Sequence, residues 1–270
     1  MSSSYDSIPI PLLATKLSIP PVHPEMVMRS RLIARLNAGL NKRLILISAP
    51  AGFGKTTLLS GWIHREKVAG AWFSIDDSDD DIVRFLSYLI ATLQTVQPNI
   101  GKTPLEILHT SQLAHIELLL VQLINEIMDI PQDFILVLDD YHLITSQPVH
   151  NALVFLLEHL PPHMHIAIAT RADPPLRLTR LRGRGQLTEL RLKELCFTPD
   201  EAAIFLKQTM GLDIDSDAIE ALNIRTEGWI AGLQMAAVSI QEREDATNFI
   251  QTLSSSNRYI MDYLIEEVLQ

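Results

Sequence analysis

Cysteine is almost missing from this chain: Cys196 is the only one among 270 residues. A single thiol cannot form a disulfide within the chain, so a disulfide-stapled fold is excluded. A metal site built from several cysteines is excluded for the same reason. Sparse cysteine fits a reducing compartment, and we expect the protein to be cytoplasmic.

Positive charge is also scarce. The chain holds 22 lysines and arginines against 32 aspartates and glutamates, which gives a formal net charge of −10. A broad basic face for nucleic acid is therefore not expected, and we predict no direct DNA binding by these residues. The arginines within Arg177–Arg184 could contact nucleic acid, but a solvated face or a partner surface is the favoured interpretation.

Long apolar runs are missing as well. No run reaches the ~18 residues that a membrane span needs, and Met1–Asp6 lacks the basic-then-apolar order of a signal peptide. The sequence also has no repeat of about 20–50 residues and no low-complexity tract. The length of 270 residues suggests one large domain or two smaller ones, and no membrane partner is expected.

The most informative segment that is present runs from Leu44 to Thr57, where an apolar run breaks into a glycine-bearing turn followed by Gly-Lys-Thr. This order is typical of a phosphate-binding P-loop, whose amides cradle anionic oxygens. Lys55 would add charge near the β- and γ-phosphates, and Thr56 would offer its hydroxyl to Mg²⁺. Ala49 replaces the usual opening glycine, a variant we expect to be tolerated. The predicted cofactor-binding residues of the loop are Ala49, Pro50, Ala51, Gly52, Phe53, Gly54, Lys55, Thr56 and Thr57.

A second apolar run, Phe134–Leu138, is followed by Asp139 and Asp140. Consecutive apolar residues suit a strand that is buried on both faces of a parallel sheet, and ligands bind at the carboxyl ends of such strands. We predict that Asp139, together with Thr56, holds Mg²⁺, directly or through water. Asp140 would orient or deprotonate the attacking water. The alternative is a simple turn or helix cap made by the two aspartates.

A third apolar run, His165–Ala169, is followed by Thr170 and Arg171. In P-loop ATPases with an extra central strand, a polar residue at the end of this strand senses the γ-phosphate. The forked donors of arginine suit that contact, so we predict Arg171 as a catalytic residue beside Lys55 and Asp140. The alternative for Arg171 is a surface salt bridge.

Apolar periodicity predicts alternating strands and helices up to about residue 195 and helices only beyond it. Residues 1–25 are rich in proline and serine and are predicted to form an extended arm. We therefore expect the arm and a P-loop nucleotide-binding domain over residues 1–195. A helical arm domain would follow over residues 196–256, and residues 257–270 would begin a further region that is cut short.

Four local features complete the prediction. Residues 98–111 are expected to form a loop because of their prolines and glycine. The order Thr-Pro-Asp-Glu from Thr198 predicts the start of a helix, and Glu227–Gln241 is expected to be a single helix. The acidic segment Asp76–Asp81 is interpreted as the negatively charged start of a helix rather than as a calcium site.

Several short motifs together resemble one known family. They are Thr15–Leu17, Val27–Leu32, Ala49–Thr57, Leu138–His142, Thr170–Leu176, Arg182–Leu187, Phe197–Ala202 and Thr226–Gln234. Their combination, and Thr226–Gln234 above all, resembles the MalT-type regulators. These are signal-transducing STAND ATPases, also described as large LuxR-type transcription regulators.

The resemblance implies an α/β fold: a P-loop NTPase of ASCE/STAND type with parallel strand order 5-1-4-3-2, followed by a small all-α domain. It implies that Val27, Arg29 and Arg31 lie near the adenine and that the cofactors are ATP or ADP with Mg²⁺. It identifies Ile260–Leu264 with the start of a winged-helix region. In the family, a sensor domain and a DNA-binding helix-turn-helix come later.

The same resemblance implies a nucleotide-operated switch. ADP would hold an inactive monomer, an inducer bound outside these residues would favour ATP and self-association, and slow Mg²⁺-dependent hydrolysis would reset the switch. One alternative is an AAA+-type mechanochemical ATPase or loader, which would need an arginine finger from a neighbour. Another is a scaffold that binds nucleotide without hydrolysis, which the intact Lys55, Thr56, Asp139 and Asp140 disfavour.

Overall fold

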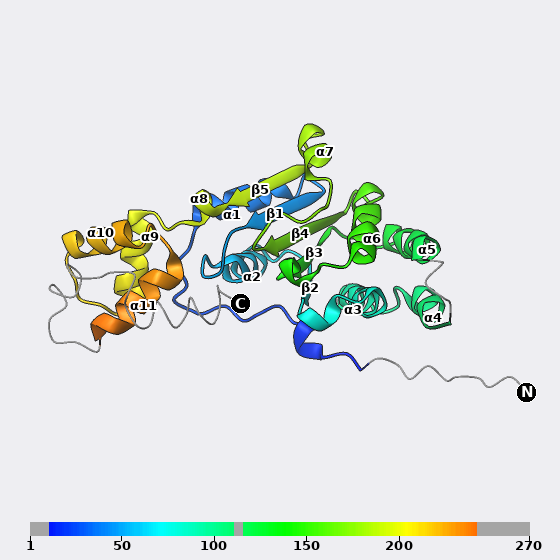
Figure 1. Cartoon of the computed structure of the whole chain (residues 1–270), viewed down its shortest axis with the longest axis horizontal. Helices are drawn as coiled ribbons and strands as arrows, with labels where there is room; N and C mark the ends of the chain where they lie inside the picture. Colours follow the sequence, from blue (N-terminus) through cyan, green and yellow to red (C-terminus); the bar gives the residue numbers. More distant parts are fainter. Residues whose placement is uncertain (1–10, 111–115, 242–270) are drawn as a thin grey trace, which may run out of the picture.

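The computed structural model describes residues 11–110 and 116–241. Its centre is one sheet of five parallel strands (Figure 1) in the order β2-β3-β4-β1-β5. The strands are β1 (Leu44–Ser48), β2 (Gly70–Ser74), β3 (Phe134–Asp139), β4 (Met164–Thr170) and β5 (Leu187–Arg191). Read from the other edge, this order is 5-1-4-3-2, so the predicted α/β topology is confirmed.

The central strands are buried on both faces. Every residue of β1, β3 and β4 is buried. Along β1, Leu44 and Leu46 join one apolar core, whereas Ile45 and Ile47 join the other. A strand with a core on each side needs apolar residues at successive positions, which explains why these strands are continuous apolar runs in the sequence.

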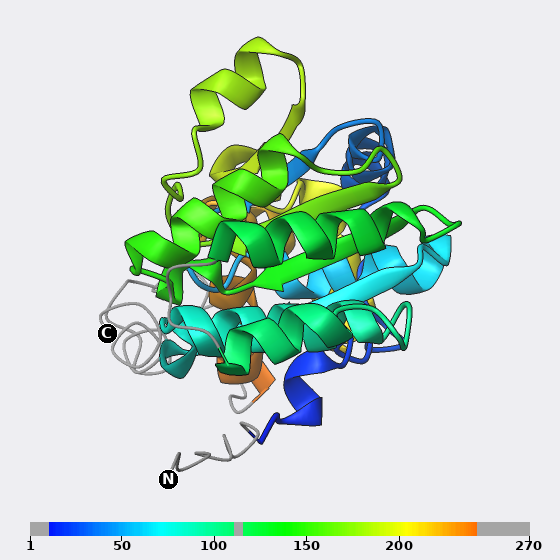
Figure 2. The same ribbon diagram turned by 90° about the vertical axis from the view of Figure 1, so that its right-hand side faces the viewer.

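Helices cover both faces of the sheet. The helices α3, α4, α5 and α6 pack on one face, and Figure 2 shows several of them in front of the strands. The helices α1 and α2 pack on the other face. The helices up to the last strand and directly after it are α1 (Ser30–Gly39), α2 (Lys55–Glu66), α3 (Ile82–Gln94), α4 (Lys102–Thr110), α5 (Ile116–Met128), α6 (Gln147–Glu158), α7 (Leu178–Gly183) and α8 (Leu192–Leu195).

Beyond α8 the chain forms helices that have their own apolar core, at one end of the sheet (Figure 1). These elements are α9 (Pro199–Ile204), a π-helical segment (Phe205–Thr209), α10 (Ser216–Arg225) and α11 (Ile230–Gln241). We call them the helical region. The predicted start of α9 is confirmed, because the Thr198 hydroxyl accepts from the Glu201 amide and the Glu201 carboxylate accepts from the Thr198 amide.

The N-terminal arm contains a short 3₁₀ turn, Ala14–Leu17, that ties it to the acidic segment. Lys16 is buried and forms ion pairs with Asp79 and with Asp76, the latter at 3.0 Å. Asp79 is fully buried and also pairs with Arg84 at 3.1 Å. Asp76 and Asp79 of the acidic segment are therefore ion-pair partners of the arm. Both ends of the segment also cap helical turns: the carboxylate of Asp76 accepts from the Ser78 amide of a 3₁₀ turn (Asp77–Asp79), and that of Asp81 accepts from the Arg84 amide at the start of α3.

Two predicted elements are wrong. Residues 102–110, expected within a loop, form α4, because Pro104 lies in the first turn, where a helix needs no amide donor. The helix expected from Glu227 begins only at Ile230, because Glu227 and Gly228 have φ of 52° and 69° and form a turn. The regions predicted over residues 242–256 and 257–270, including Ile260–Leu264, lie outside the described residues.

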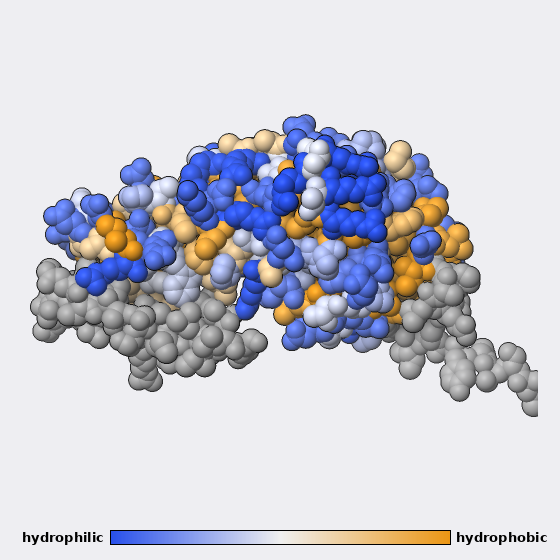
Figure 3. Space-filling view, turned by 45° about the horizontal axis from the view of Figure 1, so that its top comes forward, coloured by the Kyte–Doolittle hydropathy of each residue, from blue (hydrophilic) through white to orange (hydrophobic). Residues whose placement is uncertain are grey.

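The arginine-rich segment lies on a face that is hydrophilic over most of its area (Figure 3). Arg177 and Arg180 both pair with Glu158, the former at 3.0 Å, and Arg182 pairs with Glu189 at 2.8 Å. Three of the four arginines within Arg177–Arg184 thus have a carboxylate partner in the same chain, although two of them share one carboxylate. Within residues 11–110 and 116–241, no helix is both long and apolar enough to cross a membrane.

Candidate functional site

The loop between β1 and α2 curls at the carboxyl edge of the sheet. Gly52 and Gly54 have φ of 79° and 69°, a conformation that glycine adopts without strain. Gly54 is the N-cap of α2, so the amides of Lys55 and Thr56 belong to the first helical turn and have no partner within the helix. Free amides at a helix start, next to a glycine-rich turn, form a site for an anion such as phosphate.

Lys55 lies at the centre of this loop. Its side chain is buried, and its Nζ donates a hydrogen bond to the Pro50 carbonyl at 2.9 Å. Burial lowers the pKa of Lys55 below its ordinary value, while the nearby charge of Asp140 opposes that shift. A phosphate oxygen is a stronger partner for an ammonium group than a neutral carbonyl is. The lysine is therefore well placed to turn from its own loop toward a phosphate.

Thr56 and Asp139 meet at the edge of the sheet. The Thr56 hydroxyl donates to Oδ1 of Asp139 at 3.1 Å, and the Asp140 amide donates to the same oxygen at 3.1 Å. Burial, aided by the charge of Asp140, raises the pKa of Asp139 to about 6. A hydroxyl and a carboxylate suit Mg²⁺, which usually takes its other ligands from water and phosphate. The part of the chain that the structure describes contains no cluster of three or more histidine, cysteine or acidic ligands.

Asp140 has a strained backbone and an open side chain. Its φ of 56° is in the left-handed region, which costs roughly 1–2 kcal/mol for a residue with a Cβ. Its side chain is 46% exposed, and Oδ1 lies 3.9 Å from Nδ1 of His142. Burial lowers the pKa of His142, which favours the neutral ring at neutral pH. Sequence analysis gave no role to His142, although it lies only two positions beyond Asp140.

Arg171 follows β4, the strand next to β1 in the sheet. Because Thr170 ends β4 beside Ser48, which ends β1, Arg171 lies at the same edge of the sheet as the phosphate loop. After burial, its charge helps to lower the pKa of both Lys55 and His142. Two residues after Arg171, the carboxylate of Asp173 forms an ion pair with the guanidinium of Arg191 at the end of β5. One of its hydrogen bonds is 3.1 Å long, and the pair holds this loop against β5. The structure therefore brings Arg171 near the loop and the two aspartates.

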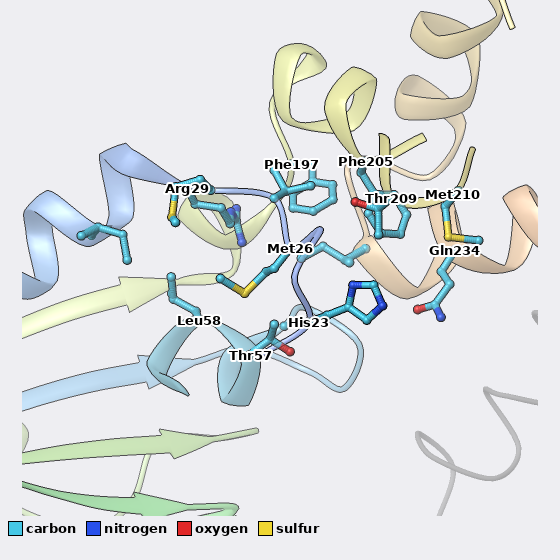
Figure 4. Close-up of a pocket in the computed structure, with 15 residues that line it drawn as sticks. His23, Met26, Arg29, Thr57, Leu58, Phe197, Phe205, Thr209, Met210 and Gln234 are labelled. Carbon is cyan, nitrogen blue, oxygen red and sulfur yellow. The ribbon is translucent and has the colours of Figure 1, made fainter. Parts of the chain in front are cut away.

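A cavity of about 400 Å³ opens beside the phosphate loop (Figure 4). Its wall includes Gly54, Thr57 and Leu58 at the start of α2. The segment before α1, α1 itself and the chain from Phe197 onward supply the other sides, with residues His23, Met26, Val27, Met28, Arg29, Ile33, Phe197, Phe205, Thr209, Met210, Ile230 and Gln234. The π-helical segment matters here, because it brings Phe205 and Thr209 to one wall. π-Helical turns occur often at functional sites.

The two predicted arginines of the arm behave differently. Arg29 lines the cavity, is 6% exposed and donates through Nη2 to the carbonyls of Leu195 and Cys196 at 2.8 and 3.0 Å. Its Nη1 is buried and has no hydrogen-bond partner among the described residues. Burial lowers the pKa of Arg29 to about 10. Arg31 does not line the cavity and instead pairs with Glu201 at 2.9 Å.

Of the residues expected to hold nucleotide, those of the phosphate loop, the two aspartates and Arg171 share one edge of the sheet. Val27 and Arg29 line the adjoining cavity, and Arg31 faces the helical region. Trp229, to which sequence analysis gave no role, contacts the phosphate loop through its indole, which donates to the Ala51 carbonyl at 3.1 Å. Its position in the most family-specific motif was the only signal available.

An all-parallel sheet in this order, a glycine-bearing loop before α2 and paired carboxylates at the end of β3 define a P-loop NTPase fold. Within that class the chain is similar to curated MalT regulators. It is 37% identical over 260 residues to the HTH-type transcriptional regulator MalT of Klebsiella pneumoniae (strain 342), covering 96% of this chain and 29% of that protein. The proteins of the same name from Serratia proteamaculans (strain 568) and Yersinia enterocolitica are 37% and 35% identical, with the same coverage.

The predicted likeness to MalT-type regulators is thereby confirmed, for a chain that spans 29% of these relatives. No protein-family model matches the chain. Among solved structures, the RuvB Holliday junction branch migration motor of Thermotoga maritima is 15% identical, with a TM-score of 0.48 over 92% of this chain and 79% of that chain.

Proposed function

We propose that this chain is the nucleotide-binding switch module of a MalT-like transcriptional regulator, which binds ATP and ADP with Mg²⁺ and hydrolyses ATP slowly. The observation that carries the proposal is the meeting of the phosphate loop, Asp139, Asp140 and Arg171 at one sheet edge, beside an apolar cavity. Its volume of about 400 Å³ falls in the range of small-molecule sites.

The groups that line the phosphate loop and the cavity indicate how a nucleotide would bind. Phosphates would lie on the loop amides and Lys55, and the base would enter the cavity, between apolar side chains such as Val27, Leu58 and Phe205. Arg29 would add a buried donor, because its Nη1 is unpaired among the described residues. Arg31 would act indirectly, since its ion pair with Glu201 holds the start of α1 against α9.

The chemistry would be electrostatic. Thr56 and Asp139 would hold Mg²⁺, which when bound neutralises charge on the β- and γ-phosphates. Asp140, with its exposed carboxylate, would orient the attacking water. Lys55 and Arg171 would donate to the charge that develops on the transferred group, and fixed donors of this kind cost no reorganisation during the reaction.

The switch itself needs a difference between the two nucleotides. A nucleotide shifts a conformational equilibrium only as far as its affinities for the two states differ. ADP would hold the resting form, whereas ATP would favour self-association after an inducer binds to a sensor domain outside these residues. Regulation of transcription would then be a property of the whole regulator rather than of this chain.

The first test is the nucleotide that the purified protein releases on denaturation, identified by chromatography. ADP in near-stoichiometric amount would support a resting switch. An empty protein that binds both nucleotides weakly and turns ATP over rapidly would favour the mechanochemical alternative instead.

The second test is calorimetry with Lys55→Ala. Loss of a charge-assisted contact should weaken ADP binding by about 10- to 100-fold. The exposed Lys102 provides the matched control, and Lys102→Ala should bind like the wild type. Unchanged ADP affinity in Lys55→Ala would contradict the phosphate site.

A further inference from the structure

The start of α11 is hydrogen-bonded to the phosphate loop. The indole Nε1 of Trp229 donates to the Ala51 carbonyl at 3.1 Å, and the Ala231 amide donates to the Gly52 carbonyl at 3.0 Å. The rings of Trp229 and Phe53 lie 6.4 Å apart between centroids. Two successive carbonyls of the loop are therefore held by the helical region, which is remote in sequence.

These two contacts fix the direction of the loop amides. In a trans peptide, the carbonyl of one residue and the N–H of the next point in opposite directions. A donor on the Ala51 carbonyl therefore sets where the Gly52 amide points, and a donor on the Gly52 carbonyl sets the Phe53 amide. Both carbonyls face α11, so both amides face away from it, and a phosphate nest depends on inward-facing amides.

Two glycines allow Trp229 to reach the loop. A Cβ on Gly228 would lie 2.7 Å from the Phe197 carbonyl oxygen, and the Gly228 carbonyl accepts from the Phe197 amide at 2.8 Å. This packing fixes the turn before Trp229. A Cβ on Gly232 would lie 2.6 Å from the Trp229 ring, so the ring rests directly on the backbone of α11. The order Gly-Trp-Ile-Ala-Gly thus shapes a rigid support for the indole.

We propose that Trp229 is a positioning residue for phosphate binding: it holds the loop amides in their anion-binding direction and links that shape to the docking of the helical region. The inference rests on the proposed nucleotide site. Linkage is reciprocal, so phosphate binding strengthens the docking of α11 by the factor by which docking strengthens phosphate binding.

The test compares ADP with adenosine, which lacks phosphate, in calorimetric titrations of the wild type and Trp229→Phe. Phenylalanine keeps an aromatic ring but removes the indole donor. We expect ADP affinity to fall about 3- to 10-fold, as for one neutral hydrogen bond, while adenosine affinity stays unchanged. ADP should also change tryptophan emission in the wild type but not in Trp229→Phe, since Trp62 and Trp72 are fully buried in the sheet core.

The matched control is Trp62→Phe, which removes an indole donor that serves Asn37 rather than the phosphate loop. It should leave the ADP and adenosine affinities as they are. A second variant, Gly232→Ala, forces the Trp229 ring to move and favours the helix itself, so it should reproduce the selective loss of ADP binding in a folded protein.

The outcomes separate the inference from the function on which it rests. Wild-type protein that fails to bind ADP would contradict the proposed function. Wild-type protein that binds ADP, with Trp229→Phe and Gly232→Ala binding it equally well, would overturn the positioning role alone. An equal loss of ADP and adenosine affinity would also overturn it, because the effect would then not concern the phosphates.

Discussion

Thr56 donates a hydrogen bond to Asp139 across 3.1 Å and 83 residues of sequence, joining the first turn of α2 to the end of β3. The contact follows from the sheet. The strands β1 and β3 flank β4 and run parallel, so the helix after β1 and the carboxylate that ends β3 reach the same edge. A cation held between these two oxygens would also lie close to any phosphate on the loop amides.

The buried carboxylate of this pair should make stability depend on pH. Because burial raises the pKa of Asp139 to about 6, the folded chain binds its proton more tightly than the unfolded chain does. Stability from this group is therefore lost as the pH rises from about 4 to 6, by up to about 3 kcal/mol. Without metal, the unfolding free energy of Asp139→Asn relative to wild type should rise by that amount between pH 4 and 7.5, measured by urea denaturation.

The control for this measurement is Asp133→Asn, at the exposed residue directly before the same strand. Its unfolding free energy should stay within about 0.5 kcal/mol of the wild type at every pH. A constant difference between Asp139→Asn and wild type across the pH range would show that folding does not raise the pKa of Asp139.

Asp140→Asn should separate binding from hydrolysis. Asparagine tolerates the left-handed backbone of this position, so the substitution removes the charge without adding strain. We expect ATP affinity within about 2-fold of wild type and turnover reduced by about 100-fold, since a positioned base contributes at least that factor. Phosphate release and calorimetry measure the two quantities, and Asp133→Asn is again the control. Undiminished turnover would remove Asp140 from the water-orienting role.

Much of the fold could be predicted because its signals are local. A strand between two cores must be apolar at successive positions, so β1, β3 and β4 could be recognised from their residues alone. The helix α4 was missed because Pro104 is equally compatible with a loop and with a first helical turn. The late start of α11 was missed because the positive φ at Glu227 is imposed by packing rather than by residue type.

The positions of the candidate site residues could be predicted from the sequence only where the residues belong to one continuous motif. The phosphate loop follows β1 and Asp139 ends β3, so the strand order brings them to one edge of the sheet. Arg29 and Arg31 bind different groups: Arg29 donates to the carbonyl of Leu195, and Arg31 donates to the carboxylate of Glu201. These partners are remote in sequence, so no local pattern predicts them. The contact of Trp229 with the loop spans 178 residues and likewise has no local pattern.

Arg171→Ala should distinguish ATP from ADP. An arginine aimed at the γ-phosphate has no such partner in ADP, so its loss should weaken ATP binding by about 10-fold or more and leave ADP binding within about 2-fold. Calorimetric titration with ADP and a non-hydrolysable ATP analogue measures both affinities. The exposed Arg184 gives a control of equal charge, and Arg184→Ala should change neither. Equal weakening of both nucleotides would mean that Arg171 does not read the γ-phosphate.

The arginine-rich face should not bind DNA at moderate salt. Arg177 and Arg180 share the carboxylate of Glu158, and Arg182 pairs with Glu189, so two carboxylates offset part of the charge that the cluster could offer to a phosphate backbone. With a net charge of −10, the chain should repel duplex DNA overall. We expect no gel retardation at about 150 mM salt. A retarded band that weakens steeply with salt and disappears in Arg180→Glu would show instead that the face meets DNA directly.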